Sequence, residues 1–148
     1  MVHNEEVIKT ARSWIGTRFH HQGRVKKFGD NKGGVDCIGL IIGVAQELDI
    51  KIGGHKAAEL DVNGYAKIPQ GDDLLLAFEL HLAPVSPEHA RLADILMFRF
   101  DKNPQHVAFL GEKNGTKTLI HSYLQARGVV EHRYDERWQE RAVAGFRL

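Results

Sequence analysis

The sequence predicts an α+β fold in which helices come first and an antiparallel sheet follows. Up to about residue 82, the apolar residues that show a period recur at helical spacing. From Ala93 onward they alternate with a period of two, in short stretches separated by turn residues. Because helices and strands occupy separate parts of the chain, this order favours an antiparallel sheet over βαβ units. At 148 residues and without internal repeats, residues 1–148 are expected to form a single domain.

The composition argues against several classes of function. Twenty basic residues against nineteen acidic ones leave a net charge of +1, which supplies neither a basic footprint for nucleic acid nor a polybasic membrane signal. A single cysteine excludes an internal disulfide. No apolar run is long enough for a membrane span, and residues 1–16 lack the features of a signal peptide. The protein is therefore expected to be made in the cytoplasm, with no nucleic-acid or membrane partner.

A first helix is predicted between Asn4, which can cap it, and Gly16, which can stop it. The loop at 17–32 is polar and contains Phe19, His20 and His21. It leads directly to the only cysteine, so it is interpreted either as one wall of a cleft or as a solvated surface loop. The apolar stripe of the helix consists of Val7, Ile8, Ala11, Trp14 and Ile15.

Residues 33–48, GGVDCIGLIIGVAQEL, predict a second helix, and the rest of the chain is organised around it. Asp36 is a good N-cap, which places Cys37 in the first turn. The apolar residues that follow surround the first turns almost completely, so the helix is expected to be buried. Gly39 and Gly43 lie four residues apart on one face, where another element can approach closely.

Cys37 has two interpretations. As a small residue of a core helix it would be inert. At a helix N-terminus, however, the positive end of the helix dipole favours thiolate over thiol, and a lone cysteine in a chain with nine histidines is a known nucleophile pattern.

The middle third carries no recognisable chemistry. Residues 49–71 have weak periodicity and several turn signals, whereas 72–82 predict a short amphipathic helix that ends before Pro84 and Pro87. Short strands are then predicted at 94–100, 106–110, 118–124, 128–133 and 142–147.

Asn114-Gly115 lies between two of these strands and is a strong signal for a two-residue hairpin. In that hairpin Lys113 pairs with Thr116. A four-residue loop would keep the same side-chain parity, whereas a three-residue loop would break it.

The hairpin register places two histidines on one face of the sheet. Counting outward, His106 lies opposite Tyr123 and Ala108 lies opposite His121, so the two imidazoles are diagonal neighbours. Together with Cys37 they provide what a cysteine peptidase needs, a nucleophile, a general base and a group that orients the base.

Two alternatives remain open at this point. The two histidines could be ordinary half-buried strand residues, or they could form a zinc site with Cys37. His20 and His21 are weaker candidates for the site because their loop precedes Cys37. The other histidines stand in polar or terminal contexts and are expected at the surface: His3, His55, His81, His89 and His132.

Four segments in order, GGVDCIGL, ADILMFRF, QHVAFLG and LIHSY, resemble the motifs of the NlpC/p60 family of cysteine peptidases. The segment GTRFHHQGR and the ending GVVEHRYDERWQERAVAGFRL are similar to the phage cell-wall peptidases within that family. The resemblance spans almost the whole chain, and its specificity lies in the ordered set of motifs.

The resemblance implies a papain-like α+β fold, with N-terminal helices and with the nucleophile helix packed on an antiparallel sheet. It implies hydrolysis of peptidoglycan stem peptides, typically at the bond from D-γ-glutamate to diaminopimelate or lysine, without a metal or other cofactor. Cys37 matches the nucleophile, His106 the general base and His121 the orienting residue. Asp36 matches a position that binds the amino end of the stem peptide in some members.

The chain departs from the family pattern at Phe19, at Ile38, where serine is usual, and at Ala93, where glycine is usual. Phe19 stands where many members carry a tyrosine whose hydroxyl lies near the oxyanion site. Stabilisation of the oxyanion then falls to the Cys37 backbone N–H and to His20 or His21. Phe19, His20, His21 and Asp36 are therefore the candidate substrate-binding residues.

The phage subfamily also implies partners and a location. Such proteins are associated with phage or prophage tails, so tail proteins are the expected partners and the cell envelope is the expected place of action. Two alternatives remain: a catalytically weak or inactive structural module of a tail tip, and an amidase or acyltransferase on the same fold.

Overall fold

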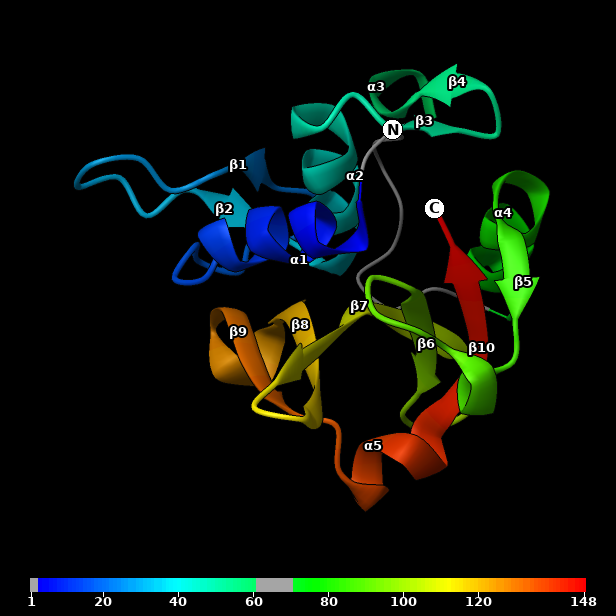
Figure 1. The fold of residues 1–148 in the computed structure, drawn as a ribbon. Helices are drawn as coiled ribbons and strands as arrows, with labels where there is room; N and C mark the ends of the chain where they lie inside the picture. Colours follow the sequence, from blue (N-terminus) through cyan, green and yellow to red (C-terminus); the bar gives the residue numbers. More distant parts are fainter. Residues whose placement is uncertain (1–2, 61–70) are drawn as a thin grey trace.

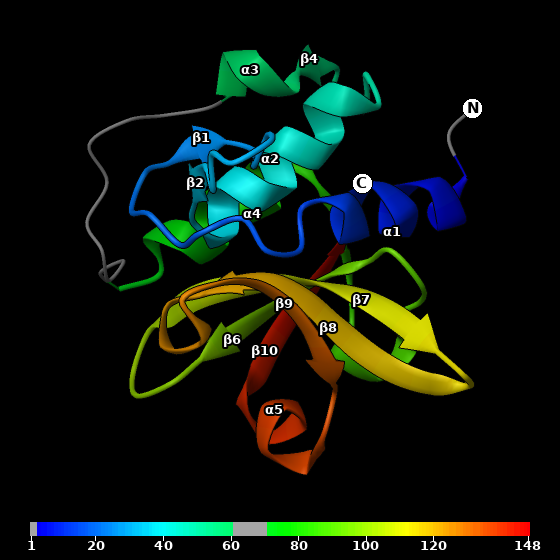
Figure 2. The ribbon, with the colours of Figure 1, turned by 90° about the vertical axis from the view of Figure 1, so that its left-hand side faces the viewer.

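The centre of the molecule is a six-stranded sheet in which every neighbouring pair is antiparallel. The structure, a computed structural model, describes residues 3–60 and 71–148. Figures 1 and 2 show the sheet with helices on both of its faces. The order of strands across the sheet is β5 (Ala83–Val85), β10 (Ala142–Arg147), β6 (Ile95–Arg99), β7 (Pro104–Lys113), β8 (Thr116–Tyr123) and β9 (Gly128–Arg133).

One face, here called the helix face, is covered by α1 (Asn4–Ser13), α2 (Cys37–Glu47) and α4 (Asp73–His81). The opposite face, the α5 face, carries α5 (Glu136–Arg141). Beside α2 lie β3 (Lys51–Ile52), β4 (His55–Lys56) and α3 (Ala57–Leu60). None of the helices within 3–60 and 71–148 combines the length and the apolarity needed to cross a lipid bilayer.

Side chains of the central strands alternate between the two faces. On β7, Val107 and Phe109 belong to the core under α1 and α2, whereas Ala108 and Leu110 belong to a second core with Trp138 of α5. This is the period-two pattern of a strand that is covered on both sides.

The second helix forms as the sequence predicts. The Asp36 carboxylate accepts a hydrogen bond from the Gly39 N–H at 2.8 Å, and Cys37 is the first helical residue. Residues 39–45 are buried, as the apolar run indicates. A β-carbon at Gly43 would lie 2.4 Å from the Trp14 ring, and one at Gly39 would lie 2.6 Å from the Gly23 carbonyl. The two glycines therefore admit close neighbours, which confirms the expectation.

The first helix begins one residue earlier than predicted. His3 is the N-cap and makes no side-chain capping bond, so the assignment of Asn4 as the cap is wrong. Gly16 follows the helix with φ +95°, a conformation that suits glycine, so the predicted stop is confirmed.

Several short elements were not predicted. The loop at 17–32 contributes β1 (Arg24–Val25), which pairs with β2 (Gly34–Val35). Part of the irregular segment forms β3, β4 and α3, while its residues 61–70 lie outside the described part of the chain. The edge strand β5 follows α4 despite Pro84, and α5 lies between two predicted strands.

The hairpin between β7 and β8 has the predicted register. Lys113 pairs with Thr116, and the turn residues Asn114 and Gly115 have φ values of 54° and 79°. Positive φ at both positions is typical of a type I′ turn.

Candidate active site

The sheet opens between β7 and β8 at the end away from the hairpin. The two strands pair from Lys113↔Thr116 to Phe109↔Ile120, and their pairing ends there. Beyond that point β7 still pairs with β6, and β8 still pairs with β9. We call this opening the β7–β8 split. Its sides are residues 106–108 of β7 and 121–123 of β8.

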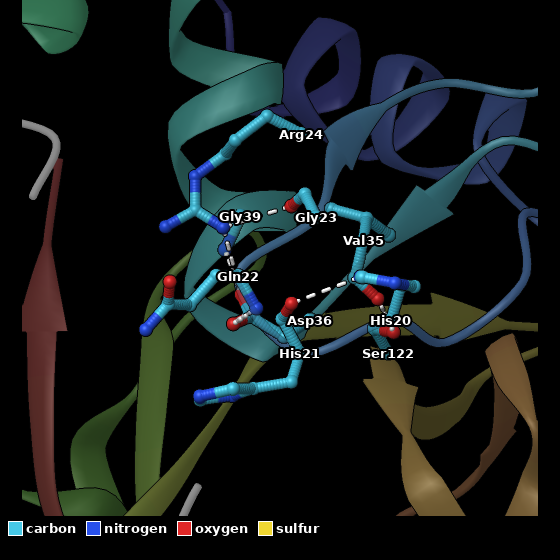
Figure 3. Close-up of polar contacts among 9 residues, drawn as sticks. All are labelled: His20, His21, Gln22, Gly23, Arg24, Val35, Asp36, Gly39 and Ser122. Carbon is cyan, nitrogen blue, oxygen red and sulfur yellow. Dashed lines mark hydrogen bonds and ion pairs between the residues drawn. The ribbon is translucent and has the colours of Figure 1, made fainter. Parts of the chain in front are cut away.

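The start of α2 lies over the split from the helix face. Val35, just before the helix, accepts a 2.6 Å hydrogen bond from the Ser122 hydroxyl of β8 (Figure 3). The half-buried Cys37 directs its sulfur to the backbone N–H of Val107 on β7. One contact is to β8 and the other is to β7, so the start of α2 contacts both sides of the opening. The thiol therefore lies next to Val107, the residue that follows His106.

Three imidazoles lie in a row on the α5 face beside the split. Nε2 of His106 lies 2.5 Å from Nδ1 of His121, which confirms that these histidines share a face and meet diagonally. Nε2 of His121 lies 2.7 Å from Nε2 of His132 on β9. Nδ1 of His132 lies 2.9 Å from the Arg133 carbonyl oxygen. His132 is half-buried, and the sequence interpretation of it as a surface residue did not foresee its contact with His121.

Aromatic rings enclose the imidazoles. The ring centroid of Trp138 lies 5.1 Å from that of His121 and 6.0 Å from that of His106. Tyr123 stacks on His121 at 5.1 Å, and Phe100 lies 5.4 Å from His106. These rings restrict the orientation of the imidazoles.

The environment keeps the Cys37 thiol and the imidazoles of His106 and His121 neutral. Burial, together with the negative charge of Asp36, raises the pKa of Cys37 to about 12, although nearby backbone N–H groups oppose the shift. Burial, and to a smaller extent His132, lowers the pKa of His106 to about 3. Burial also lowers the pKa of His121 well below its usual value.

The expectation of a thiolate at rest is thus wrong for this structure. The helix N-terminus does favour the thiolate, but burial and the adjacent carboxylate outweigh it. Within the described residues, no hydrogen bond joins the Cys37 sulfur to His106.

Asp36 connects the loop that precedes it to the start of α2 (Figure 3). Its buried carboxylate accepts hydrogen bonds from the Gly39 N–H and the Gln22 N–H, each at 2.8 Å, and lies 3.1 Å from the Arg24 guanidinium. Arg24 also donates to the Gly23 carbonyl at 2.8 Å. These bonds hold residues 22–24 beside the first turn that carries Cys37.

The three other candidate residues lie in the same loop. Phe19 is half-buried, and its N–H donates to the Arg127 carbonyl. His20 is exposed, its N–H donates to the Val35 carbonyl, and its ring Nδ1 lies 2.9 Å from the His21 carbonyl oxygen. The loop therefore runs along the start of α2, as a cleft wall would. A substrate-binding role for Phe19, His20, His21 and Asp36 stays a prediction.

His132 and Trp138 are the site residues that sequence reasoning missed. On β9, His132 pairs with Leu119, which is two residues from His121 on β8 and therefore on the same face. Strand parity could have identified His132. Trp138 could have been found from Asp135, whose carboxylate caps α5 by accepting from the Trp138 N–H.

The geometry of the histidine pair disfavours the zinc alternative. A tetrahedral zinc ion holds its nitrogen ligands about 3.3 Å apart. The facing nitrogens of His106 and His121 are 2.5 Å apart and hydrogen-bond to each other. Among the described residues, no group of three or more His, Cys, Asp or Glu side chains is placed to hold a metal ion.

No protein-family model matches the chain, and no curated protein matches it. Among solved structures, the NlpC/p60 domain of the peptidoglycan hydrolase SagA has 17% identity and a TM-score of 0.64, over 99% of this chain and 100% of that one. An NlpC/p60 family protein from Bacillus cereus has 18% identity and a TM-score of 0.63, over 99% of this chain and 40% of that one. An N-acetylmuramoyl-L-alanine amidase from Bacteroides uniformis has 10% identity and a TM-score of 0.57, over 97% of this chain and 96% of that one.

At these identities the likeness concerns the fold. The chain has the α+β fold of NlpC/p60 domains, with its N-terminal helices and the Cys37 helix packed on an antiparallel sheet.

Proposed function

We propose that the protein hydrolyses amide bonds in the stem peptide of peptidoglycan, with Cys37 as nucleophile, His106 as general base and His121 as the residue that orients His106. One observation carries this proposal. The hydrogen-bonded pair of His106 and His121 lies at the β7–β8 split directly beside Val107, and the Cys37 sulfur lies against the Val107 N–H.

The mechanism begins from a neutral thiol and a neutral imidazole. As the Cys37 sulfur bonds to the carbonyl carbon, the thiol proton passes to Nδ1 of His106 and the carbonyl π electrons move to oxygen. The backbone N–H groups of Cys37 and Ile38 lie near the sulfur at the positive end of α2, where they stabilise the oxyanion.

Collapse of the tetrahedral intermediate releases the first product. The C–N bond breaks, and the leaving amine takes the proton from His106. A water molecule then attacks the thioester while His106 accepts one of its protons. Breaking of the C–S bond frees the acid product, and the proton returns to the sulfur.

We propose that the scissile bond joins D-γ-glutamate to diaminopimelate or lysine. The ordered motifs around Cys37, His106 and His121 support this choice, as does the likeness of the fold to a domain of a peptidoglycan hydrolase. Phe19, His20, His21 and Asp36 would form the side of the binding site next to α2. The place of Asp36 in the motif GGVDCIGL supports a role at the amino end of the stem peptide.

We further propose that the protein acts from a phage or prophage tail on the cell envelope. The segment GTRFHHQGR and the C-terminal segment that resembles phage peptidases support this location. Purified tail particles from the source bacterium test it. The protein should co-sediment with intact tails, and its absence from them would refute the tail association without affecting the enzymatic proposal.

The substrate proposal is tested by digestion of defined muropeptides, with products identified by mass spectrometry. Cleavage inside the stem peptide, lost in Cys37→Ala, is the expected result. Because one of the similar structures is an amidase, cleavage at a second position must be distinguished from cleavage inside the stem peptide. Release of an intact stem peptide from the sugar would assign amidase activity instead. No cleavage of any muropeptide would favour a structural tail module.

A further inference from the structure

A chain of hydrogen bonds connects the candidate base to a main-chain carbonyl. It runs from His106 to His121 at 2.5 Å, from His121 to His132 at 2.7 Å, and from His132 to the carbonyl oxygen of Arg133 at 2.9 Å. Three imidazoles and one carbonyl are thus joined end to end across β7, β8 and β9.

The carbonyl at the end of this chain fixes every proton in it. A carbonyl oxygen only accepts hydrogen bonds, so Nδ1 of His132 must carry a proton. In a neutral ring, Nε2 of His132 is then an acceptor, which requires a proton on Nε2 of His121. Nδ1 of His121 is an acceptor in turn, so His106 carries its proton on Nε2.

This order leaves the lone pair of His106 on Nδ1. That nitrogen is the one nearer the main chain of β7, where the Cys37 sulfur lies beside the Val107 N–H. Within the described residues, no hydrogen bond occupies Nδ1 of His106. The base is therefore presented in the tautomer that can accept the thiol proton.

We propose that His132 is a positioning residue: through its bond to the Arg133 carbonyl it fixes the tautomers of His121 and His106, so that Nδ1 of His106 is the free base. Its effect on the rate rests on the function proposed above, whereas its effect on the tautomers does not. Trp138 supports the arrangement because its ring contacts those of His106, His121 and His132, which limits ring flips.

The protonated nitrogens can be observed directly by NMR spectroscopy of ¹⁵N-labelled protein, since pyridine-type and pyrrole-type ring nitrogens have distinct shifts. We expect Nδ1 of His106, Nδ1 of His121 and Nε2 of His132 to be pyridine-type in the wild-type protein near pH 7. A proton on Nδ1 of His106 would overturn the proposal, whether or not the protein cleaves peptidoglycan.

Two substitutions separate the role of His132 from mere packing. His132→Leu keeps most of the volume but removes the acceptor, so the His121 N–H loses its partner and the reversed order, with a proton on Nδ1 of His106, becomes populated. His132→Gln can still accept from His121 and donate to the Arg133 carbonyl, so it should restore the wild-type order. Unchanged tautomers in His132→Leu would refute the proposal.

Activity provides a second readout once a substrate is known. We expect kcat to fall on the order of tenfold in His132→Leu with KM nearly unchanged, in line with the effect of other partners that orient a functional histidine. His132→Gln should recover most of this loss. The exposed His55 supplies a control, because His55→Gln should leave both the tautomers and kcat unchanged.

Discussion

Cys37 and His106 show how local environment can reverse the charge state that sequence position suggests. The thiol stands in the first turn of a helix, where the dipole favours a negative charge. Its burial and the neighbouring Asp36 carboxylate favour the neutral form more strongly. His106 is neutral mainly because it is buried, as the thiol is. The proton would therefore leave the sulfur during attack on the substrate and not before.

The neutral thiol predicts a distinctive pH dependence of alkylation. Because the pKa of Cys37 is raised to about 12, its rate with iodoacetamide should increase about tenfold for each pH unit from 6 to 10, as the thiolate fraction does. In the denatured protein the rate should level off above about pH 9, close to the ordinary thiol pKa. A plateau that begins below pH 8 in the folded protein would show a preformed thiolate instead.

The two central histidines should differ in their contribution to the rate. His106→Ala removes the proton acceptor and is expected to lower kcat on the order of 100- to 10,000-fold. His121→Ala removes only an orienting partner and should cost less. Steady-state kinetics on one muropeptide compares them, with circular dichroism as the control for folding. Equal or reversed losses would contradict these roles.

For individual residues, the sequence predicted the position correctly where residue spacing alone determines it. The hairpin signal placed His106 and His121 on one face, and the N-cap placed Cys37 in the first turn. Sequence reasoning did not connect His132 to His121, because strand parity was applied only to the hairpin and not to β9. It also failed for the ionisation of Cys37, because burial arises from packing that residue spacing does not encode.

Among the elements, those that form largely from local signals were predicted well. The helix α2 has a strong cap and an apolar run, and β9 and β10 have the predicted bounds. The helix α5 has six residues and is held by the packing of Trp138 against the sheet, so no periodic pattern is long enough to reveal it. β1, β2 and β5 have two or three residues each, too few for a visible period, and β5 pairs with β10, a strand distant in sequence.

The contact between α1 and α2 depends on the missing side chain of Gly43. A β-carbon there would lie 2.4 Å from the Trp14 ring, which is 3% exposed and has little room to move. Although alanine favours a helix by about 1 kcal/mol over glycine, Gly43→Ala should lower the free energy of unfolding by about 1–3 kcal/mol. Urea denaturation measures the change.

The exposed Gln46 provides a control in the same helix. Gln46→Ala should change the free energy of unfolding by no more than about 0.5 kcal/mol. Equal stability of Gly43→Ala and wild type would show that Trp14 and α2 are packed less tightly than the structure indicates.

In the whole molecule, the sheet lies between the helix that carries the nucleophile and the imidazoles. The helix face carries Cys37 and the α5 face carries the imidazoles, and both lie beside the stretch where β7 and β8 stop pairing. Both cores must therefore be intact for the site to exist. The fold class and the order of elements were predictable from periodicity, whereas the split is a long-range property of the sheet that no local pattern shows.

The buried imidazoles predict a loss of stability in mild acid. The unfolded chain takes up a proton at His106 below about pH 6.5, but the folded protein does so only near pH 3. The unfolded state thus binds more protons, and the free energy of unfolding falls as the pH falls through this window. At pH 5 this residue alone accounts for about 2 kcal/mol, and His121 acts in the same direction.

Urea denaturation at pH 7 and pH 5 tests this expectation. His106→Gln should lose less stability than wild type between the two values, because it lacks the titrating group. His89→Gln, at an exposed histidine, serves as the control and should behave like wild type. Equal losses in all three proteins would mean that His106 is not buried as a neutral ring.

Digestion of purified peptidoglycan sacculi tests whether the Cys37 thiol cleaves the stem peptide. Wild-type protein, Cys37→Ala and Cys37→Ser are incubated with the same sacculi, and the released fragments are identified by mass spectrometry. We expect stem-peptide fragments from the wild-type protein alone, with both variants folded. Release of the same fragments by Cys37→Ala would rule out Cys37 as the nucleophile.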